Sequence, residues 1–350
     1  MVKVSGTVVK AVGGLYTVAE GPQTGCRQED CRQEDRPKEV QDAEPRLYMA
    51  KPRGIFRKNK LRLLPGDRVS LVESGDPDCP YSIYAVEARK NIMIRPPLVN
   101  LDSIIIVVAL TDPAPDWYFV DKMLIIAAVN GLKAIVYFSK SDLFYRLPVA
   151  DREATQREIE AYQAAGFTCV ISATEDKVAD ESAYENGRAG GYESSCRDKL
   201  FPFIAGRMVA LSGQSGVGKS TLINKLLDAE KMSTGKVSSK LGRGRHTTRH
   251  VEFFPCLNGY IADTPGFSSL DLAEIGVEEN QILPAYPELH SNEICRFAGC
   301  RHLNEPGCEV LRLVTETPML KARYDRYSFF RRLLLSHKTA YGKDRLRPRL

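Results

Sequence analysis

Residues 208–226 read MVALSGQSGVGKSTLINKL, and this stretch decides the fold. Its centre satisfies the pattern G-x-x-x-x-G-K-[ST], with an apolar strand before it and a helical segment after it. Glycines in such a loop let backbone N–H groups surround a phosphate, and the N-terminus of the following helix adds partial positive charge. The stretch therefore predicts a nucleotide phosphate site. Its candidate residues are Gly213, Gln214, Ser215, Gly216, Val217, Gly218, Lys219, Ser220 and Thr221.

Two side chains of this loop are candidates for the phosphate chemistry. Lys219 would reach the β- and γ-phosphates, and Ser220 would bind Mg²⁺ through its hydroxyl. Asp-Thr-Pro-Gly at residues 263–266 follows another predicted strand. We expect Asp263 to hold the Mg²⁺ shell and the Gly266 amide to sense the γ-phosphate.

The base-recognition candidates lie earlier in the chain, at the ends of two apolar strands. They are Ser139, Lys140, Ser141 and Asp142, followed by Ser172 and Ala173. These segments look like the NKxD and SA elements of GTPases, in which the aspartate accepts hydrogen bonds from the guanine N1 and exocyclic amine. Adenine cannot supply that pattern, so GTP and GDP are the expected ligands. Ser139 stands where asparagine is usual, and an ATP-binding protein is the alternative if this change spoils the guanine site.

The order of these elements is unusual. GTPases ordinarily run from the phosphate loop through a switch threonine and DxxG to NKxD and SA. In this chain residues 139–142 and 172–173 precede the phosphate loop, and DTPG follows it. The order indicates a circular permutation, in which the same sheet closes with altered connections.

The 350-residue chain is long enough for two or three domains, and the predicted fold is a multidomain α/β protein. Its composition, 43% hydrophobic and 27% charged, excludes a mainly disordered chain. Residues 1–90 hold short β-rich runs around turn signals and predict an OB-type barrel, with an SH3-like barrel as the alternative. Residues 91–273 alternate apolar strands with helices, which predicts a helix-covered parallel sheet. Residues 274–350 predict a helical zinc-binding domain with a basic tail.

Two polar segments interrupt this pattern. The sequence CRQED occurs twice in tandem, at residues 26–30 and 31–35, and predicts a solvated loop between strands. A metal-ligand role for Cys26 and Cys31 is the alternative. Residues 174–200 predict an exposed connection.

Membrane insertion and export are not expected. The longest aliphatic run, Ile104–Leu110, is far shorter than the roughly 18–20 residues that cross a bilayer. The first residues, MVKVSGTVVK, lack the apolar core of a signal peptide. We therefore expect a cytoplasmic protein without a membrane partner.

Three cysteines and a histidine crowd into fourteen residues near the end of the chain. Cys295, Cys300, His302 and Cys308 supply three thiolates and one imidazole, the set that a closed, tetrahedral, structural Zn²⁺ requires. Such a set leaves no open position for a catalytic water. The cluster predicts one structural zinc ion.

These motifs together resemble the RsgA (YjeQ/YloQ) family of circularly permuted GTPases, which act on the small ribosomal subunit. The resemblance rests on GQSGVGKSTLIN, GRGRHTTRH, DTPGF, CRFAGCRHLNEPGC, RP-x₃-N-x-D at residues 95–102, and RYDRY near the end. It implies an N-terminal OB domain, a central GTPase domain and a C-terminal zinc domain. It also implies hydrolysis of GTP stimulated by the small subunit during late assembly. The chain departs from the family pattern at Ser139, at the CRQED repeat and at Arg249.

The switch candidates are chosen by their local pattern. Thr248 in the segment TTRH is expected to complete the Mg²⁺ shell, with Thr247 as the second choice. Phe267 follows DTPG, where Ras-like enzymes carry the glutamine that orients water, so unstimulated turnover should be slow. His246 is a candidate catalytic group, and a group or rearrangement contributed by the ribosome is the alternative.

Basic residues gather on the predicted barrel, in the switch segment and in the tail. In residues 47–64 they are interleaved with Tyr48 and Phe56, a pattern typical of RNA binding by phosphate contacts and base stacking. We expect the small subunit and its rRNA as partners of a monomeric GTPase. An rRNA-binding assembly checkpoint or chaperone, in which nucleotide only sets conformation, is the alternative function.

Overall fold

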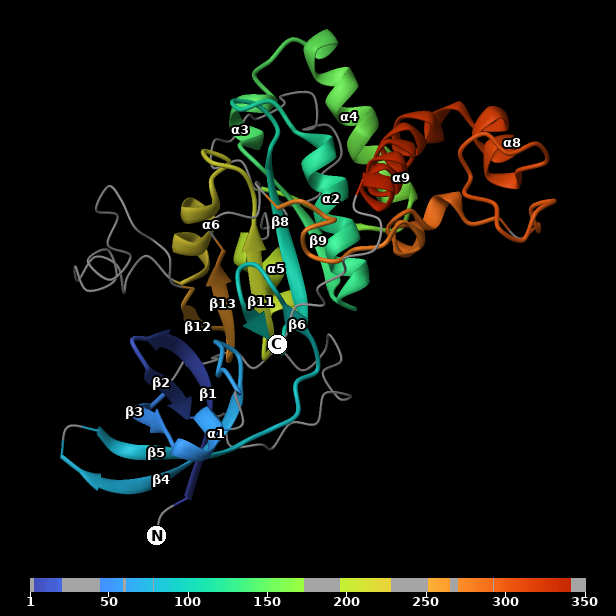
Figure 1. Cartoon of the computed structure of the whole chain (residues 1–350). Helices are drawn as coiled ribbons and strands as arrows, with labels where there is room; N and C mark the ends of the chain where they lie inside the picture. The colour runs from blue at the N-terminus through green and yellow to red at the C-terminus, as the bar shows by residue number, and fades with distance from the viewer. Residues whose placement is uncertain are drawn as a thin grey trace.

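The computed structural model describes most of the chain, namely residues 3–20, 45–58, 61–77, 79–172, 196–227, 251–264, 270–291 and 293–340. These residues form a closed barrel, a six-stranded sheet with helices on both faces, and a C-terminal helical segment (Figure 1). The CRQED repeat lies outside the described residues. No helix in the described ranges is long and apolar enough to cross a bilayer.

The N-terminal part is a closed barrel with the strand order β1-β2-β3-β5-β4. A hairpin at Gly13 and Gly14, both at positive φ, joins its first two strands. Strands β3 and β5 run parallel, and the other pairs are antiparallel. Val8, Val18 and Ile83 are among the side chains that fill the interior. The elements are β1 (Lys3–Val12), β2 (Leu15–Glu20), β3 (Leu47–Pro52), α1 (Gly54–Lys58), β4 (Arg68–Asp76) and β5 (Cys79–Val86).

The central sheet has the strand order β10-β9-β8-β11-β13-β12, and only the edge strand β12 runs antiparallel to its neighbour. Every residue of β8 is buried, as its uninterrupted apolar sequence predicts for a strand covered on both faces. The parallel order brings the carboxyl ends of β9 and β11 to the same edge. The strands are β8 (Ser103–Ala109), β9 (Lys133–Ser139), β10 (Thr168–Ile171), β11 (Met208–Ser212), β12 (Phe253–Cys256) and β13 (Gly259–Asp263).

Helices cover the two faces of this sheet, and the alternation of β8 shows which side each covers. Ile104 and Ile106 pack with α2 and α4, whereas Ile105 packs with α5 and α6. Helix α5 begins at Cys196, so the predicted exposed connection over 174–200 was wrong at its end. Cys196, Leu200 and Ile204 share one buried helical face. The helices are α2 (Trp117–Val129), α3 (Ser141–Phe144), α4 (Val149–Ala164), α5 (Cys196–Ile204) and α6 (Lys219–Leu226).

A short ribbon of β6 (Ile92–Met93) and β7 (Leu98–Val99) leads from the barrel to the sheet. Asn100, at φ 59°, donates from Nδ2 to the carbonyl oxygen of Gly66 at 2.8 Å and accepts from the Lys90 amide. A Cβ on Gly66 would lie 2.0 Å from the carbonyl oxygen of Val99, so only glycine allows this close approach. The barrel is therefore joined to the sheet by polar contacts of the linker itself.

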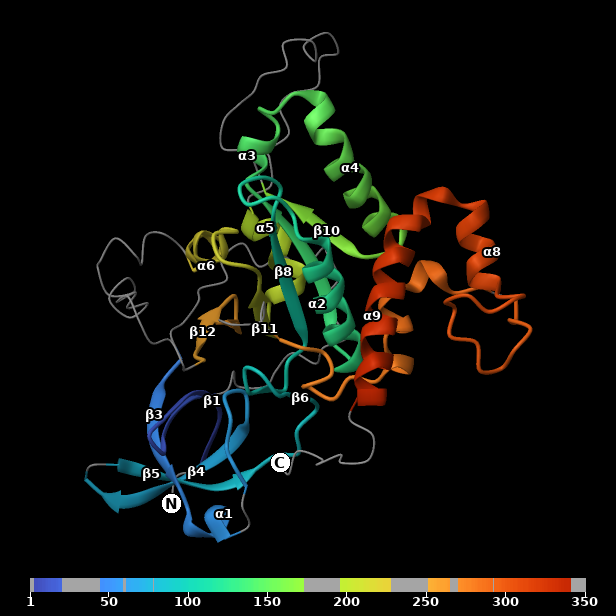
Figure 2. The same cartoon turned by 45° about the horizontal axis from the view of Figure 1, so that its top comes forward.

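The C-terminal segment packs against the helical face formed by α2 and α4 (Figure 2). Tyr286, Tyr327 and Leu334 belong to the same buried cluster as Leu124 of α2. The hydrophobic core therefore continues from the sheet into the C-terminal helices. These elements are η3 (Glu279–Gln281), η4 (Leu283–Ala285), η5 (Pro287–Leu289), α8 (Glu309–Glu316), η6 (Pro318–Leu320) and α9 (Lys321–Ala340).

Candidate functional site

The phosphate loop lies between the end of β11 and the start of α6, in the order that its sequence predicts. A Cβ on Gly213 would lie 2.6 Å from the carbonyl oxygen of Val107, and Gly218 adopts φ 90° immediately before the helix. Glycine is needed at the first position for the close approach and at the second for the left-handed backbone. The loop therefore wraps tightly over the end of β8, with the N-terminus of α6 facing the phosphate position.

The Lys219 ammonium group is held over this loop. Its Nζ donates to the carbonyl oxygens of Gly213 and Gln214, both at 2.6 Å. These contacts fix a positive charge at the N-terminus of α6, where a nucleotide phosphate would lie. The lysine thus lies on the loop that the sequence predicts to bind phosphate.

The last residue of β9, Ser139, joins the base-recognition segment to the phosphate loop. Its hydroxyl donates to the carbonyl oxygen of Val217 at 2.6 Å, although the two residues are 78 positions apart. A Cβ on Gly218 would lie 3.7 Å from the Ser139 hydroxyl oxygen, in ordinary contact. The base-recognition segment therefore lies directly beside the phosphate loop, and the Ser139 hydroxyl forms the contact between them.

The rest of the base-recognition segment turns sharply at Lys140, which adopts a left-handed φ of 58°. Ser141 then begins α3, and its hydroxyl lies 2.8 Å from the Ser172 carbonyl oxygen and 2.7 Å from the Ser172 hydroxyl. Asp142 is exposed in the first turn of α3. The structure thus brings residues 139–142 and Ser172 together, as predicted, whereas Ala173 lies outside the described residues.

A loop that the sequence analysis did not single out, residues 111–116, also lines this site. The Lys140 ammonium group donates to the carbonyl oxygen of Asp112, and the Gln214 amide donates to Asp116 Oδ2 at 2.7 Å. One short loop therefore contacts both the base-recognition segment and the phosphate loop. The signal in the sequence was an Asp at the N-cap position just before the helix at Trp117.

Asp263 ends β13, the strand next to β11, and its Cα pairs with that of Leu211. Thr264 is buried, and its hydroxyl donates to the Leu211 carbonyl oxygen. Ser220 lies in the first turn of α6, at the end of the phosphate loop, and Asp263 ends the strand that pairs with β11, which leads into that loop. Gly266 and Phe267, and the switch candidates His246, Thr247, Thr248 and Arg249, lie outside the described residues.

The four candidate zinc ligands are gathered in the C-terminal segment. The ligand atoms of Cys295, Cys300, His302 and Cys308 lie within 4.8 Å of one another. His302 Nδ1 is 3.6 Å from Cys295 Sγ and 3.5 Å from Cys308 Sγ. Three sulfurs and one nitrogen in this arrangement fit the closed tetrahedral set of a structural zinc ion.

Burial favours the neutral forms of Cys300, His302 and Cys308. It raises the pKa of the Cys300 thiol to about 12 and raises that of Cys308. It also lowers the pKa of His302, which favours the neutral imidazole that binds metals. A divalent cation would therefore displace thiol protons on binding.

The loop that carries these ligands is held by Glu305 and by helix α9. Burial alone would raise the pKa of the Glu305 carboxyl, but hydrogen bonds from the amides of Leu303 and Arg301 lower it to about 2. From α9, the Tyr324 hydroxyl donates to the carbonyl oxygens of His302 and Leu303, at 2.9 and 3.0 Å. The ligand loop is thus supported by contacts outside its own four ligands.

The description RsgA GTPase belongs to the protein-family model that matches residues 86–273, more than half of this chain. The chain belongs to the RsgA GTPase family.

Several curated relatives are similar to this chain over most of its length. "Small ribosomal subunit biogenesis GTPase RsgA" of Ruminiclostridium cellulolyticum is 34% identical over 325 residues, which cover 92% of this chain and 91% of the relative. The protein of the same name from Carboxydothermus hydrogenoformans is 36% identical over 286 residues, covering 81% and 89%.

Solved structures agree with this relationship. YloQ, described as a circularly permuted GTPase, is 28% identical and superposes with a TM-score of 0.67 over 96% of each chain. YjeQ from Thermotoga maritima is 24% identical with a TM-score of 0.69, covering 95% of this chain and 99% of that one, and shows the shared fold. The predicted family resemblance and the permuted GTPase fold are confirmed.

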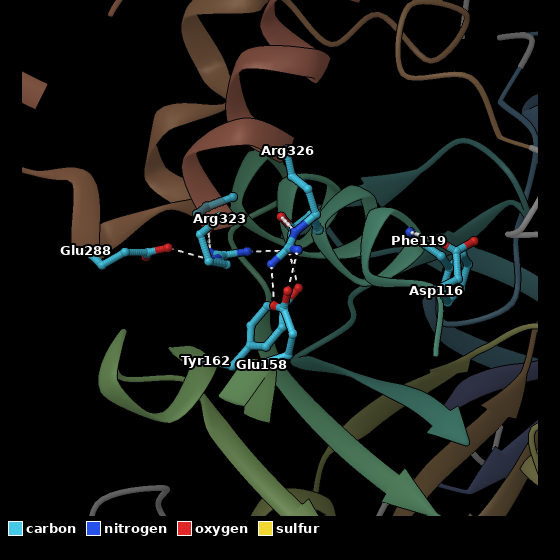
Figure 3. A network of polar contacts seen from close by, with 9 residues as sticks. Asp116, Phe119, Glu158, Tyr162, Glu288, Arg323 and Arg326 are labelled. Carbon is cyan, nitrogen blue, oxygen red and sulfur yellow. Dashed lines mark hydrogen bonds and ion pairs between the residues drawn. The ribbon is translucent and has the colours of Figure 1, made fainter. Parts of the chain in front are cut away.

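This RsgA GTPase buries three arginines of its predicted basic tail. Arg323, Arg326 and Arg331 lie inside the protein, so the interpretation of the whole tail as a basic surface was wrong for them. Both oxygens of the buried Asp121 on α2 are engaged, Oδ1 by Arg323 and Oδ2 by Arg326 at 2.9 Å (Figure 3). The burial of Arg323 and Arg326 is favourable because they pair with acidic residues on distant segments, which the local run of charges does not reveal. Arg331 instead donates to the Tyr327 hydroxyl at 2.9 Å.

The ion pairs of α9 continue onto neighbouring elements. Arg326 binds both carboxylate oxygens of Glu158 on α4, at 2.9 and 2.7 Å, and Arg323 binds Glu288 at 2.6 Å (Figure 3). The Arg323 guanidinium also lies 4.6 Å from the ring centre of Tyr162 and 4.4 Å from that of Tyr286. Burial alone would lower the pKa of Arg323, but the carboxylate of Asp121 raises it above its ordinary value.

The two barrel aromatics predicted to stack on RNA are partly buried. Tyr48 and Phe56 pack against the barrel core, and the Tyr48 hydroxyl donates to Glu20 at 3.2 Å. The exposed side chains of this segment include Leu47, Met49, Lys51, Arg53 and Ile55. The solvent-exposed surface of the barrel at residues 47–55 therefore carries both aliphatic and basic side chains.

Proposed function

We propose that this protein binds GTP·Mg²⁺ and hydrolyses it to GDP and phosphate when it docks on the small ribosomal subunit, whose late maturation it assists. The contact between Ser139 and Val217 carries the proposal, because it joins a guanine-recognition segment to a phosphate loop. The names of the relatives, small ribosomal subunit biogenesis GTPase, support the choice of partner.

The proposed roles of the site residues follow from their chemistry. Asp142 would accept hydrogen bonds from the guanine N1 and amine, and the Lys140 stem would cover the base. Lys219 and the backbone amides of residues 213–220 would hold the phosphates and stabilise charge that develops on them. Ser220, Asp263 and Thr248 would hold Mg²⁺, which neutralises phosphate charge when bound. Thr248 is chosen on its sequence pattern alone.

Hydrolysis is expected to depend on the subunit. Phe267 cannot orient a water molecule, so His246 or a group from the ribosome would position the nucleophile. The test is GTP turnover with and without purified small subunits. Stimulation supports the proposal, whereas equal turnover favours the checkpoint or chaperone function that Phe267 leaves open.

Base recognition gives a first prediction. Asp142→Asn should weaken GTP binding by on the order of 100-fold and improve binding of xanthosine triphosphate, because the asparagine amide can donate to the xanthine carbonyl. Competition against a fluorescent guanine nucleotide measures both affinities. Asp151→Asn, an exposed aspartate in the first turn of α4, is the matched control. An unchanged preference for GTP would contradict the role of Asp142, and ATP competing equally with GTP would favour the ATP alternative.

We also propose one structural zinc ion, held by Cys295, Cys300, His302 and Cys308. A zinc-selective chelator should release about one ion per chain and disorder residues 293–308, while GDP binding remains. Zinc release is measured with a chromogenic indicator, and hydrogen exchange reports the affected residues. Cys308→Ser should abolish the release signal, whereas Cys169→Ser should leave it intact. Purified protein that contains no zinc would contradict the assignment.

Other parts of the proposal concern the domains. The strand order β1-β2-β3-β5-β4 with parallel β3 and β5 supports an OB-type barrel over residues 1–90, with its aliphatic and basic face toward rRNA. Residues 91–273 would form the GTPase domain and residues 274–350 the zinc domain. We propose a monomer that acts in the cytoplasm, where the small subunit is assembled.

A further inference from the structure

Asp116 uses its two carboxylate oxygens for two different elements. Oδ1 accepts from the backbone amide of Phe119 at 3.0 Å and so caps the N-terminus of α2. Oδ2 accepts from the side-chain amide of Gln214 in the phosphate loop at 2.7 Å. A hydrogen bond to an ionised carboxylate is stronger than one between neutral groups. Asp116 therefore ties the phosphate loop to the start of a helix.

Gln214, the residue held by Asp116, also contacts Lys219, the lysine proposed to bind phosphate. The carbonyl oxygen of Gln214 accepts from Lys219 Nζ at 2.6 Å, so movement of Gln214 would displace the ammonium group. The loop at residues 111–116, which ends in Asp116, approaches the phosphate loop at a second point. There, Pro113 Cδ lies 4.0 Å from a Cβ built on Gly216. Its third contact is the bond from Lys140 to Asp112.

Helix α2 is in turn fixed to the C-terminal helix α9. Asp121 lies five residues after Asp116, about 7.5 Å along the helix axis. Its two oxygens bind Arg323 and Arg326, which are buried with it. Figure 3 shows Asp116 and Phe119 at the start of α2, and Arg323 and Arg326 on the neighbouring helix α9. Movement of α9 relative to the sheet would therefore pull on the helix that carries Asp116.

We propose that Asp116 is a positioning residue for the phosphate loop. Through α2, the affinity of this loop for the nucleotide then depends on the contacts that hold α9 against α2. The proposal rests on the guanine-nucleotide site proposed above and assigns the C-terminal helix an influence on it. A partner that shifts α9 would thereby change nucleotide affinity without contacting the nucleotide.

The first test separates the contact with Gln214 from the helix cap. Asp116→Ser keeps a capping oxygen but is too short to reach Gln214, and Gln214→Ala removes the donor. Each variant should weaken GDP binding about tenfold, and the double variant should bind no more weakly than the weaker single variant. The preference for GTP over xanthosine triphosphate should stay unchanged, because Asp142 is untouched.

The matched control is Asp151→Ser, which makes the same change at an exposed aspartate in the first turn of α4. It should bind GDP with the affinity of the unmodified protein, and thermal unfolding confirms that each variant is folded. Additive effects of Asp116→Ser and Gln214→Ala, or unchanged GDP affinity in Asp116→Ser, would overturn the positioning role. If the unmodified protein binds no guanine nucleotide, the proposed function fails instead.

The second test addresses α9. Arg326→Lys keeps the charge but loses the two-pronged contact with Glu158, and it should weaken GDP binding roughly threefold. In the Asp116→Ser background the same change should have no further effect, because the connection is already cut. Arg332→Lys, an exposed position on α9, is the control. No effect of Arg326→Lys, or an equal effect in both backgrounds, would overturn the dependence on α9.

Discussion

Lys219→Ala is expected to lower subunit-stimulated GTP turnover by on the order of 10³-fold. The reason is that Lys219 is held over the proposed phosphate site by the carbonyl oxygens of Gly213 and Gln214. Its positive charge would stabilise the negative charge that develops on the phosphates during hydrolysis. Single-turnover hydrolysis with saturating small subunits measures the effect on chemistry separately from binding.

Lys225→Ala is the control for this experiment, since Lys225 is exposed in the last turn of the same helix. The control should retain the turnover of the unmodified protein. Both variants should unfold at a similar temperature, because Lys219 contributes contacts to the site rather than to the core. Turnover in Lys219→Ala within a few-fold of the unmodified protein would contradict the assignment of the phosphate loop.

The second large effect is on stability, at Arg323. Arg323→Met should lower the free energy of unfolding by about 3–5 kcal/mol, because it leaves the buried Glu288 carboxylate without its cation and removes one partner of Asp121. It also removes the guanidinium from between the rings of Tyr162 and Tyr286, which are both raised in pKa, first by burial and then by the charge of Asp121. Urea denaturation followed by fluorescence measures the loss.

Arg332→Met makes the same chemical change on the exposed side of α9 and should alter stability by less than about 0.5 kcal/mol. Arg323→Lys should be intermediate, because it keeps the charge but cannot form the forked contacts. Equal denaturation midpoints for Arg323→Met and Arg332→Met would show that the ion-pair cluster contributes nothing to stability.

Much of the site could be predicted because its motifs are local. Each glycine of the phosphate loop acts through its own backbone, and the cysteines and histidine of the zinc cluster lie within fourteen residues. The order of the motifs was equally visible, because a circular permutation is a property of the chain itself. Sequence alone also indicated that Ser139 replaces asparagine, but its contact with Val217 depends on the pairing of β9 and β11 with β8.

Other features could not be predicted from the sequence, because local spacing does not show which distant segment covers a residue in the folded protein. Tyr48 reads as an RNA-stacking residue because aromatics among basic residues are typical of such surfaces, yet in the barrel it packs edge-on against Tyr81. Arg323 and Arg326 read as surface charges because helical spacing shows which residues share a face and not what covers it. Their partner Asp121 is 202 positions from Arg323.

The amino-acid sequence by itself determined the chemistry that we propose for this protein: a phosphate loop, a candidate guanine-recognition segment in permuted order, and a candidate zinc-ligand set. These depend on residue type and short spacing, which the chain carries directly. Only the tertiary structure decided that loop 111–116 contacts both the base-recognition segment and the phosphate loop of the proposed nucleotide site. It also decided that the basic helix α9 is held against α2 by the ion pairs of Asp121. Such contacts join segments far apart in the chain, so they exist only once the sheet has ordered its strands and a shared core has buried the charges.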